Sequence, residues 1–168
     1  TTFILCLSFL WGCCDCDPKS KVSEADQMIL IPAGEFIMGT NKVDTEDTHK
    51  KIGAVKPLYL DQHPERKTFL DAYYIDRYEV TNAKYSHFLK ANQFTDIPAH
   101  WQDGVFPEGQ GDHPVTQVTW WEAWSYCQWS GKQLPTEEQW EKAARGPDGL
   151  PFPWGEKFIK GKANVGIE

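Results

Sequence analysis

Residues 118–146 read VTWWEAWSYCQWSGKQLPTEEQWEKAARG and carry the strongest fold signal in the chain. The stretch contains two capping boxes, in which a Thr is followed three residues later by Glu or Gln, and a capping box marks the N-terminus of a helix. The boxes begin at Thr119 and at Thr136. Gly131 and Gly146 follow the two segments and are typical helix-terminating residues. The stretch therefore predicts two consecutive helices joined by a short connection.

Tryptophan and small residues recur at helical spacing in both helices and predict one buried face on each. The chain has 8 Trp among its 168 residues, and core filling is their expected role because an indole buries a large apolar area. We therefore expect both helices to be scaffold, with Trp120, Trp124 and Trp140 in the core. The stripe residues are Trp120, Ala123, Trp124 and Cys127 in the first helix and Trp140, Ala143 and Ala144 in the second.

Two strand signals lie nearer the N-terminus. Residues 28–31 and 36–38 are short apolar runs on either side of a Pro-Ala-Gly-Glu turn, a pattern typical of a β-hairpin. Residues 68–76 are rich in aromatic and β-branched side chains, which favour a strand.

A third helix is predicted over residues 82–91. Thr81 is placed to cap it, and Tyr85, Phe88 and Leu89 share one face at helical spacing. This face is the expected core contact of the helix.

Two long segments read as loops. Residues 41–60 are polar and charged; a cation site there is the weaker reading and a solvated loop the stronger one, because the acidic spacing does not match a calcium loop. Residues 94–113 hold several Pro and Gly and little periodicity, and long loops of this kind are often functional. Trp101 lies in this loop outside any helical stripe, so lining a cleft and filling the core are equally plausible roles for it.

Composition bounds the class of protein. The chain carries 24 acidic and 17 basic residues, a formal net charge of −7. This balance argues against a nucleic-acid partner, because phosphates require a basic surface. Mixed short strands, three helices and many loops predict a domain that mixes α and β structure.

The N-terminal segment has the pattern of an export signal. Residues 1–11 are apolar and uncharged but too short to span a membrane. The run Leu10-Trp11-Gly12-Cys13 resembles a lipobox, with Cys13 as the lipidation candidate; ordinary secretion and neither fate are the alternatives. We assign residues 1–17 to a secretory or lipoprotein signal, 18–27 to a linker and 28–168 to the folded domain. The protein is expected outside the cytoplasm, in the periplasm or cell envelope, with membrane contact only through the signal or a lipid anchor.

Several long motifs, in order, resemble the sulfatase-modifying-factor domain of formylglycine-generating enzymes. The resemblance implies an α+β fold related to C-type lectins, loop-rich and here incomplete at its C-terminus, so that residues 28–168 are the N-terminal part of the domain. The motifs are IPAGEFIMG (31–39), AYYIDRYEVTN (72–82), HPV (113–115), VTW (118–120), WSGKQLPTE (129–137), WEKAARG (140–146) and PWG (153–155).

The resemblance also implies cofactors and site residues. It implies structural calcium, for which Asn164 and Val165 resemble the first ligands of a partial site. It implies a copper-binding cysteine pair that oxidises a substrate cysteine; because no such pair is in the chain, copper is expected only if a further C-terminal part supplies it. Cys127 corresponds to a disulfide position, although a buried free thiol fits its helix equally well. Trp101 resembles a tryptophan of the substrate cleft.

Two functions of different classes follow from the resemblance. The first is a formylglycine-generating oxidase acting on an unfolded sulfatase or another protein substrate, with no catalytic residue in this chain, which is expected to be inactive alone. The alternative is a non-catalytic binding or scaffold lipoprotein of the cell envelope with the same fold.

Overall fold

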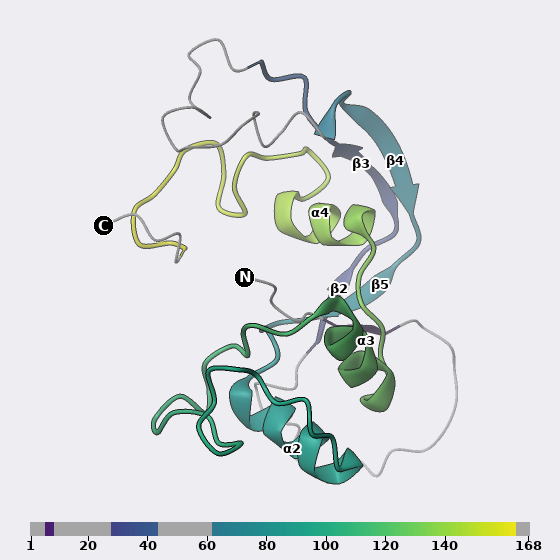
Figure 1. The fold of residues 1–168 in the computed structure, drawn as a ribbon. Helices are drawn as coiled ribbons and strands as arrows, with labels where there is room; N and C mark the ends of the chain where they lie inside the picture. Colours follow the sequence, from purple (N-terminus) through teal and green to yellow (C-terminus); the bar gives the residue numbers. More distant parts are fainter. Residues whose placement is uncertain (1–5, 9–27, 44–61, 164–168) are drawn as a thin grey trace, which may run out of the picture. The chain divides into compact units, whose positions relative to one another are not determined.

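The computed structural model describes residues 6–8, 28–43 and 62–163. The chain forms two compact units, each built from two separate stretches of sequence (Figure 1). Unit 1 comprises Thr1–Pro32 and Ala72–Pro135, and unit 2 comprises Ala33–Asp71 and Thr136–Glu168.

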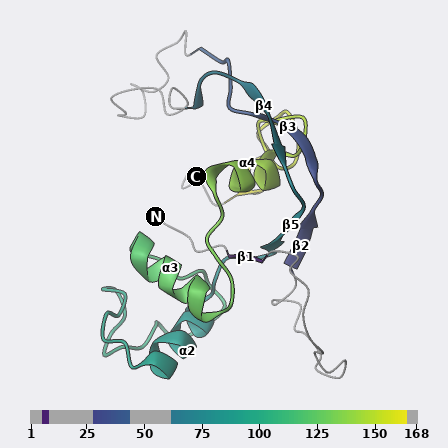
Figure 2. The same cartoon turned by 90° about the vertical axis from the view of Figure 1, so that its right-hand side faces the viewer.

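A three-stranded antiparallel sheet lies in unit 1, with β1 (Leu7–Ser8), β5 (Tyr73–Asp76) and β2 (Met28–Ile31) in that order. Figure 2 shows the short β1 next to β5. Ile75 of β5 is opposite Leu7 on one side and Ile29 on the other. The side chains of Tyr73 and Ile75 are buried, as expected for alternate residues of a strand with one face toward the core.

Two helices complete unit 1, and the sequence predicted both of their N-termini. Helix α2 (Asn82–Asn92) is capped by Thr81, whose side chain accepts a hydrogen bond from the backbone N–H of Lys84. Helix α3 (Trp120–Trp129) begins with the predicted Thr119 capping box. The helices pack on each other (Figure 1), and the predicted face of α2 is confirmed as buried.

The buried face of α3 differs from the predicted stripe. Ala123, Tyr126 and Cys127 are buried, whereas the side chains of Trp120 and Trp124 are 55% and 41% exposed. The physical reason is the position of Cys127, which is disulfide-bonded to Cys6, and of Tyr126, whose ring packs on the aromatic face of α2. These contacts turn the helix so that its indoles lie at the surface, and the prediction that Trp120 and Trp124 fill the core is wrong.

Unit 2 contains a second, two-stranded sheet of β3 (Gly34–Met38) and β4 (Arg66–Leu70), paired antiparallel with Phe36 opposite Thr68. The predicted hairpin is therefore wrong, because β2 pairs with β5 and β3 pairs with β4. The predicted strand over residues 68–76 is in fact two strands, interrupted at residues 71–72. Pairing partners distant in sequence, which local patterns do not encode, decided both outcomes.

Helix α4 (Glu137–Arg145) packs on β3 in unit 2 (Figure 1). Its predicted Thr136 capping box and its C-cap at Gly146 are confirmed. The buried side chains are polar, namely Gln139, Glu141 and Lys142, while Trp140 is 53% exposed, so its prediction as a core residue is wrong.

Hydrogen bonds explain how this polar face is buried. The guanidinium of Arg145 donates to the backbone carbonyls of Gly39, Gly149 and Leu150 at 2.8, 2.6 and 2.9 Å, and also pairs with the Glu141 carboxylate. Glu141 in turn accepts a 2.7 Å bond from the backbone N–H of Gly39. Buried charges require such partners, and here the partners join α4 to Gly39, which directly follows β3, and to the loop that follows the helix.

Lysine 142 adds a second polar link to the same strand. The Nζ atom of Lys142 donates to the backbone carbonyl of Gly34 at 2.9 Å and lies 5.9 Å from the ring centroid of Phe36. Burial lowers the pKa of this ammonium group from its ordinary value.

The two sheets and the helices are compatible with the predicted α+β class. Residues 94–113 contain neither helix nor strand beyond one isolated bridge, as expected for a loop. In the described ranges, no helix combines the length and the apolar character that a bilayer crossing requires.

Candidate functional site

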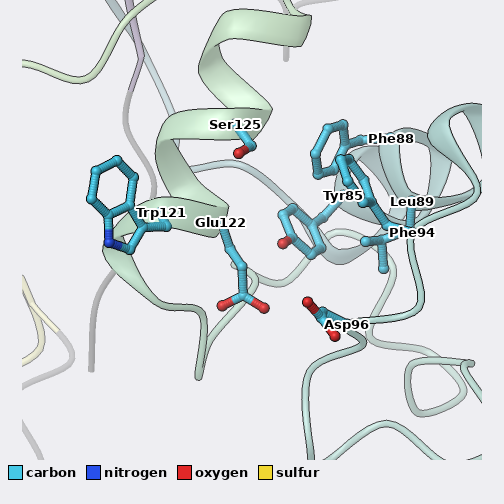
Figure 3. A pocket seen from close by; sticks show the side chains of 8 residues that line it. All are labelled: Tyr85, Phe88, Leu89, Phe94, Asp96, Trp121, Glu122 and Ser125. Carbon is cyan, nitrogen blue, oxygen red and sulfur yellow. The ribbon is translucent and has the colours of Figure 1, made fainter.

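A cavity of 170 Å³ lies in unit 1 between α2, α3 and the start of the loop that follows α2 (Figure 3). We call it the α2–α3 cavity. It combines aromatic and aliphatic side chains with two carboxylates, and none of its lining residues is basic. The lining residues are Tyr85, Phe88, Leu89, Phe94, Asp96, Trp121, Glu122 and Ser125.

Three oxygen-bearing groups converge in the α2–α3 cavity. Figure 3 shows the hydroxyl of Tyr85 and the carboxylates of Asp96 and Glu122 directed toward the same space. Burial raises the pKa of the Tyr85 hydroxyl above its ordinary value, and the negative charges of Glu122 and Asp96 raise it further.

Helix capping fixes the position of Glu122. Its Oε2 atom accepts a 2.6 Å hydrogen bond from the backbone N–H of Thr119, and the Glu122 backbone N–H donates to Thr119 Oγ1 at 3.3 Å. The carboxylate is thereby held at the first turn of α3 while it lines the cavity. Its role as a cap was predicted; its role in a cavity was not.

Aromatic side chains that line the α2–α3 cavity pack on one another and on Trp101. The ring of Phe88 lies 5.4 Å from that of Tyr85 and 5.2 Å from that of Phe94. Tyr85 also packs edge-on against Trp101, with 6.3 Å between ring centroids. Such tilted and edge-to-face pairs hold the rings in defined orientations, so the cavity wall is preorganised.

A second cavity of 480 Å³ in unit 1 is more polar. Its wall includes Asp76 and Lys132, which form a 2.5 Å ion pair, and His87, whose ring lies 5.5 Å from that of Trp129. Glu79 and Lys84 also line it, so both acidic and basic side chains face the cavity and it presents no single sign of charge to a ligand.

The structure places Trp101 in the core of unit 1. Its side chain is 6% exposed and packs on Tyr85 and Phe106, and it does not line either cavity described above. Its indole N–H is buried without a hydrogen-bond partner in the described part of the chain. The substrate-cleft role of Trp101 stays a prediction.

Cysteine 127 is disulfide-bonded to Cys6, with 121 residues of sequence separation. The sequence had assigned Cys6 to the export signal and so offered no partner within the domain. In the structure Cys6 and Leu7 are fully buried, and the backbone of Leu7 exchanges hydrogen bonds with Gln133.

The remaining predicted site residues are not among the described ones. The lipidation candidate Cys13 and the calcium candidates Asn164 and Val165 all lie outside them. Among residues 6–8, 28–43 and 62–163, no group of three or more His, Cys, Asp or Glu side chains is placed to hold a metal ion.

Sequence reasoning missed Asp96 as a site residue. Asp96 lies in the loop and Glu122 on α3, and no motif spacing links residues so far apart. Only the packing of α2 on α3 brings them to one cavity. The one available signal was the occurrence of an aspartate shortly after Phe94 in a long loop, and such loops often carry function.

Comparison with known proteins assigns the family. The family model described as the sulfatase-modifying factor enzyme 1-like domain matches residues 15–168. Protein YfmG of Bacillus subtilis, described as uncharacterized, is 36% identical over 155 residues, which cover 83% of this chain and 30% of that protein. The formylglycine-generating enzyme of Bos taurus is 32% identical in an alignment 184 residues long, which covers 84% of this chain and 46% of that enzyme.

A third relative is described by its name as inactive. The inactive C-alpha-formylglycine-generating enzyme 2 of Mus musculus is 30% identical in an alignment 177 residues long, which covers 88% of this chain and 58% of that protein. The chain thus spans about half or less of the length of most of these relatives. Because the family model matches nearly the whole chain, the chain belongs to the sulfatase-modifying factor enzyme 1-like family.

Proposed function

We propose that the natural protein oxidises a cysteine of an extended protein substrate, such as an unfolded sulfatase, to formylglycine, and that this chain contributes the substrate-binding surface. The observation that carries the proposal is the match to the bovine formylglycine-generating enzyme over 84% of the chain. The open α2–α3 cavity beside the exposed tryptophans of α3 supports a binding role, because large exposed aromatic surfaces commonly mark interaction sites.

The chain's own residues do not supply the redox centre. No cysteine follows Cys127 in the sequence, and Cys127 is held in a disulfide, so its sulfur is not a thiolate ligand. We assign no step of the oxidation to this chain. Copper chemistry is proposed only for a natural protein that provides the cysteine pair, and structural calcium at Asn164 and Val165 likewise remains a proposal.

A cysteine-containing peptide from a sulfatase is the substrate for the test. The peptide is incubated aerobically with copper and either the 168-residue chain or the protein expressed from its natural gene, and formylglycine is detected by mass spectrometry. We expect conversion by the natural protein and none by the 168-residue chain. Failure of the natural protein to convert any cysteine peptide would refute the oxidase proposal.

A second function is favoured by the disulfide and by the inactive mouse relative. A non-catalytic protein of this family, acting as a binding or scaffold module of the cell envelope, needs no free thiol. Peptide binding by the natural protein without conversion is the result that distinguishes this function from the oxidase.

We also propose an extracytoplasmic location. The disulfide between Cys6 and Cys127 supports it, because disulfides persist mainly in oxidising compartments. Lipid attachment at Cys13 requires cleavage before that residue, and removal of an ordinary secretory signal over residues 1–17 also takes Cys6 away. Either processing event and this disulfide therefore exclude each other in one mature chain. The intact mass and the N-terminal sequence of protein recovered from the envelope decide between them.

A further inference from the structure

The three oxygen groups of the α2–α3 cavity come from three separate elements. Tyr85 belongs to α2, Asp96 to the following loop and Glu122 to the first turn of α3. In Figure 3 their oxygens point toward a common space. Two carboxylates without a basic neighbour in the lining make this space electronegative, and a cation is the complementary ligand.

The shape of the ligand follows from the rest of the wall. Phe88, Leu89 and Phe94 form an apolar side next to the oxygens, and aromatic faces attract cations as well as aliphatic groups. The cavity volume of 170 Å³ is well above the about 10–15 Å³ that a single water requires. This is room for a small cation with a short aliphatic stem.

The arrangement of acceptors distinguishes two cationic groups. A guanidinium is a planar fork suited to parallel acceptors of one carboxylate, whereas an ammonium is a compact charge with three donors in diverging directions. Acceptors that approach from three elements match the ammonium. We propose that the α2–α3 cavity binds a primary alkylammonium group, with the ammonium between Asp96 and Glu122 and the aliphatic stem against Phe88 and Phe94.

Both a free aliphatic amine and a lysine side chain of a peptide present this chemistry. Binding at the cavity does not depend on oxidase chemistry, because none of its residues is assigned a step of that reaction. The proposal therefore goes beyond the proposed function and can be tested without it.

The test is a chemical-shift titration of the intact chain, with the indole N–H of Trp121, which lines the cavity, as the reporter. The probes are n-butylammonium, n-butylguanidinium and the neutral 1-butanol. We expect n-butylammonium to bind at least tenfold more tightly than 1-butanol and more tightly than n-butylguanidinium, with an affinity that falls as salt is added. Equal binding of 1-butanol, or tighter binding of n-butylguanidinium, overturns the assignment.

Matched variants test the residues. Asp96→Asn and Glu122→Gln remove the charges with little change of shape, and Gln at this position still completes a capping box. Each is expected to weaken n-butylammonium binding at least fivefold, while Glu108→Gln, at an exposed carboxylate of the same loop outside the cavity lining, leaves it unchanged. Unchanged binding in both cavity variants refutes the site.

A last arm identifies the source of the ammonium. Nα-acetyl-lysine amide presents the lysine side chain with its ammonium group free and its backbone ends blocked. Binding as tight as that of n-butylammonium supports a lysine side chain as the ligand, and binding of n-butylammonium alone supports a free amine. Binding of neither overturns the proposal.

Discussion

Replacing Arg145 by Ala is the sharpest test of how unit 2 is held together. The guanidinium donates to three backbone carbonyls between 2.6 and 2.9 Å and pairs with Glu141, and the two side chains are only 20% and 8% exposed. Removal of one partner from a buried ion pair costs about 3 to 5 kcal/mol, because the remaining charge stays buried. Arg145 is partly reached by water, so we expect the lower part of this range, about 3 to 4 kcal/mol.

Two companion variants separate charge from geometry. Arg145→Lys keeps the charge but loses the fork that reaches Gly39, Gly149 and Leu150 together, and we expect a loss of about 2 kcal/mol. A double-mutant cycle of Arg145→Ala with Glu141→Gln measures the coupling of the pair, and Gln retains an acceptor for the Gly39 N–H. Because the two are in direct contact, we expect a coupling of about 1 to 3 kcal/mol.

Local stability is the appropriate assay, because the two units need not unfold in a single transition. Hydrogen exchange at the Gly39 amide, which donates to Glu141, and at the Ile37 amide, which donates to the Pro147 carbonyl, reports opening of unit 2. Amides of α2 in unit 1 are the internal control. If Arg145→Ala lowers the opening free energy of the unit 2 amides by less than about 1 kcal/mol, the Arg145–Glu141 pair behaves like an exposed ion pair and does not hold unit 2 together.

Three further results are expected. Gly39 has φ of +81°, and a Cβ there would lie 2.3 Å from the Gln62 carbonyl oxygen, so Gly39→Ala should lower the urea midpoint strongly. Gly109→Ala, with φ of +77° and open space around the added methyl group, should cost only about 1 to 2 kcal/mol. Equal losses in the two variants would contradict the predicted clash with Gln62. Burial raises the pKa of Tyr73 from 10.0 to about 12, so the unfolded chain releases this proton first, and the free energy of unfolding should fall by up to about 2.7 kcal/mol between pH 10 and pH 12. Urea titrations at stepped pH should show a shallower alkaline decline for Tyr73→Phe, and an identical decline would count against the shift. Reduction of the Cys6–Cys127 disulfide, which closes a loop of 121 residues, should destabilise the folded chain by about 5 kcal/mol in urea unfolding. The reductant should have no effect on Cys127→Ser, and the same midpoint with and without reductant in the unaltered chain would argue that this bond does not form.

Helix ends were predicted well because their signals are local. The capping boxes at Thr119 and Thr136 join residues three apart, so the bonds they form do not depend on the rest of the fold. The helix predicted over residues 82–91 begins at Asn82 and extends one residue further, to Asn92.

Strand partners and buried helix faces were predicted poorly because they depend on distant residues. The turn between β2 and β3 suggested a hairpin, yet each strand pairs with residues at least 28 positions away along the chain. The tryptophans of α3 suggested a core stripe, yet the disulfide of Cys127 and the packing of Tyr126 set the rotation of the helix. Periodicity identifies an apolar face but not which of two neighbouring faces finds a partner.

The sequence by itself determined the family, through ordered motifs from residue 31 to residue 155, and the start of each helix, through caps that act within one turn. Only the tertiary structure decided the pairing of Cys6 with Cys127, the hydrogen-bond network around Arg145 and the placement of Asp96 and Glu122 in one cavity. The reason is that each of these features joins groups far apart along the chain. Their proximity arises from the packing of whole elements, which no short stretch of sequence encodes.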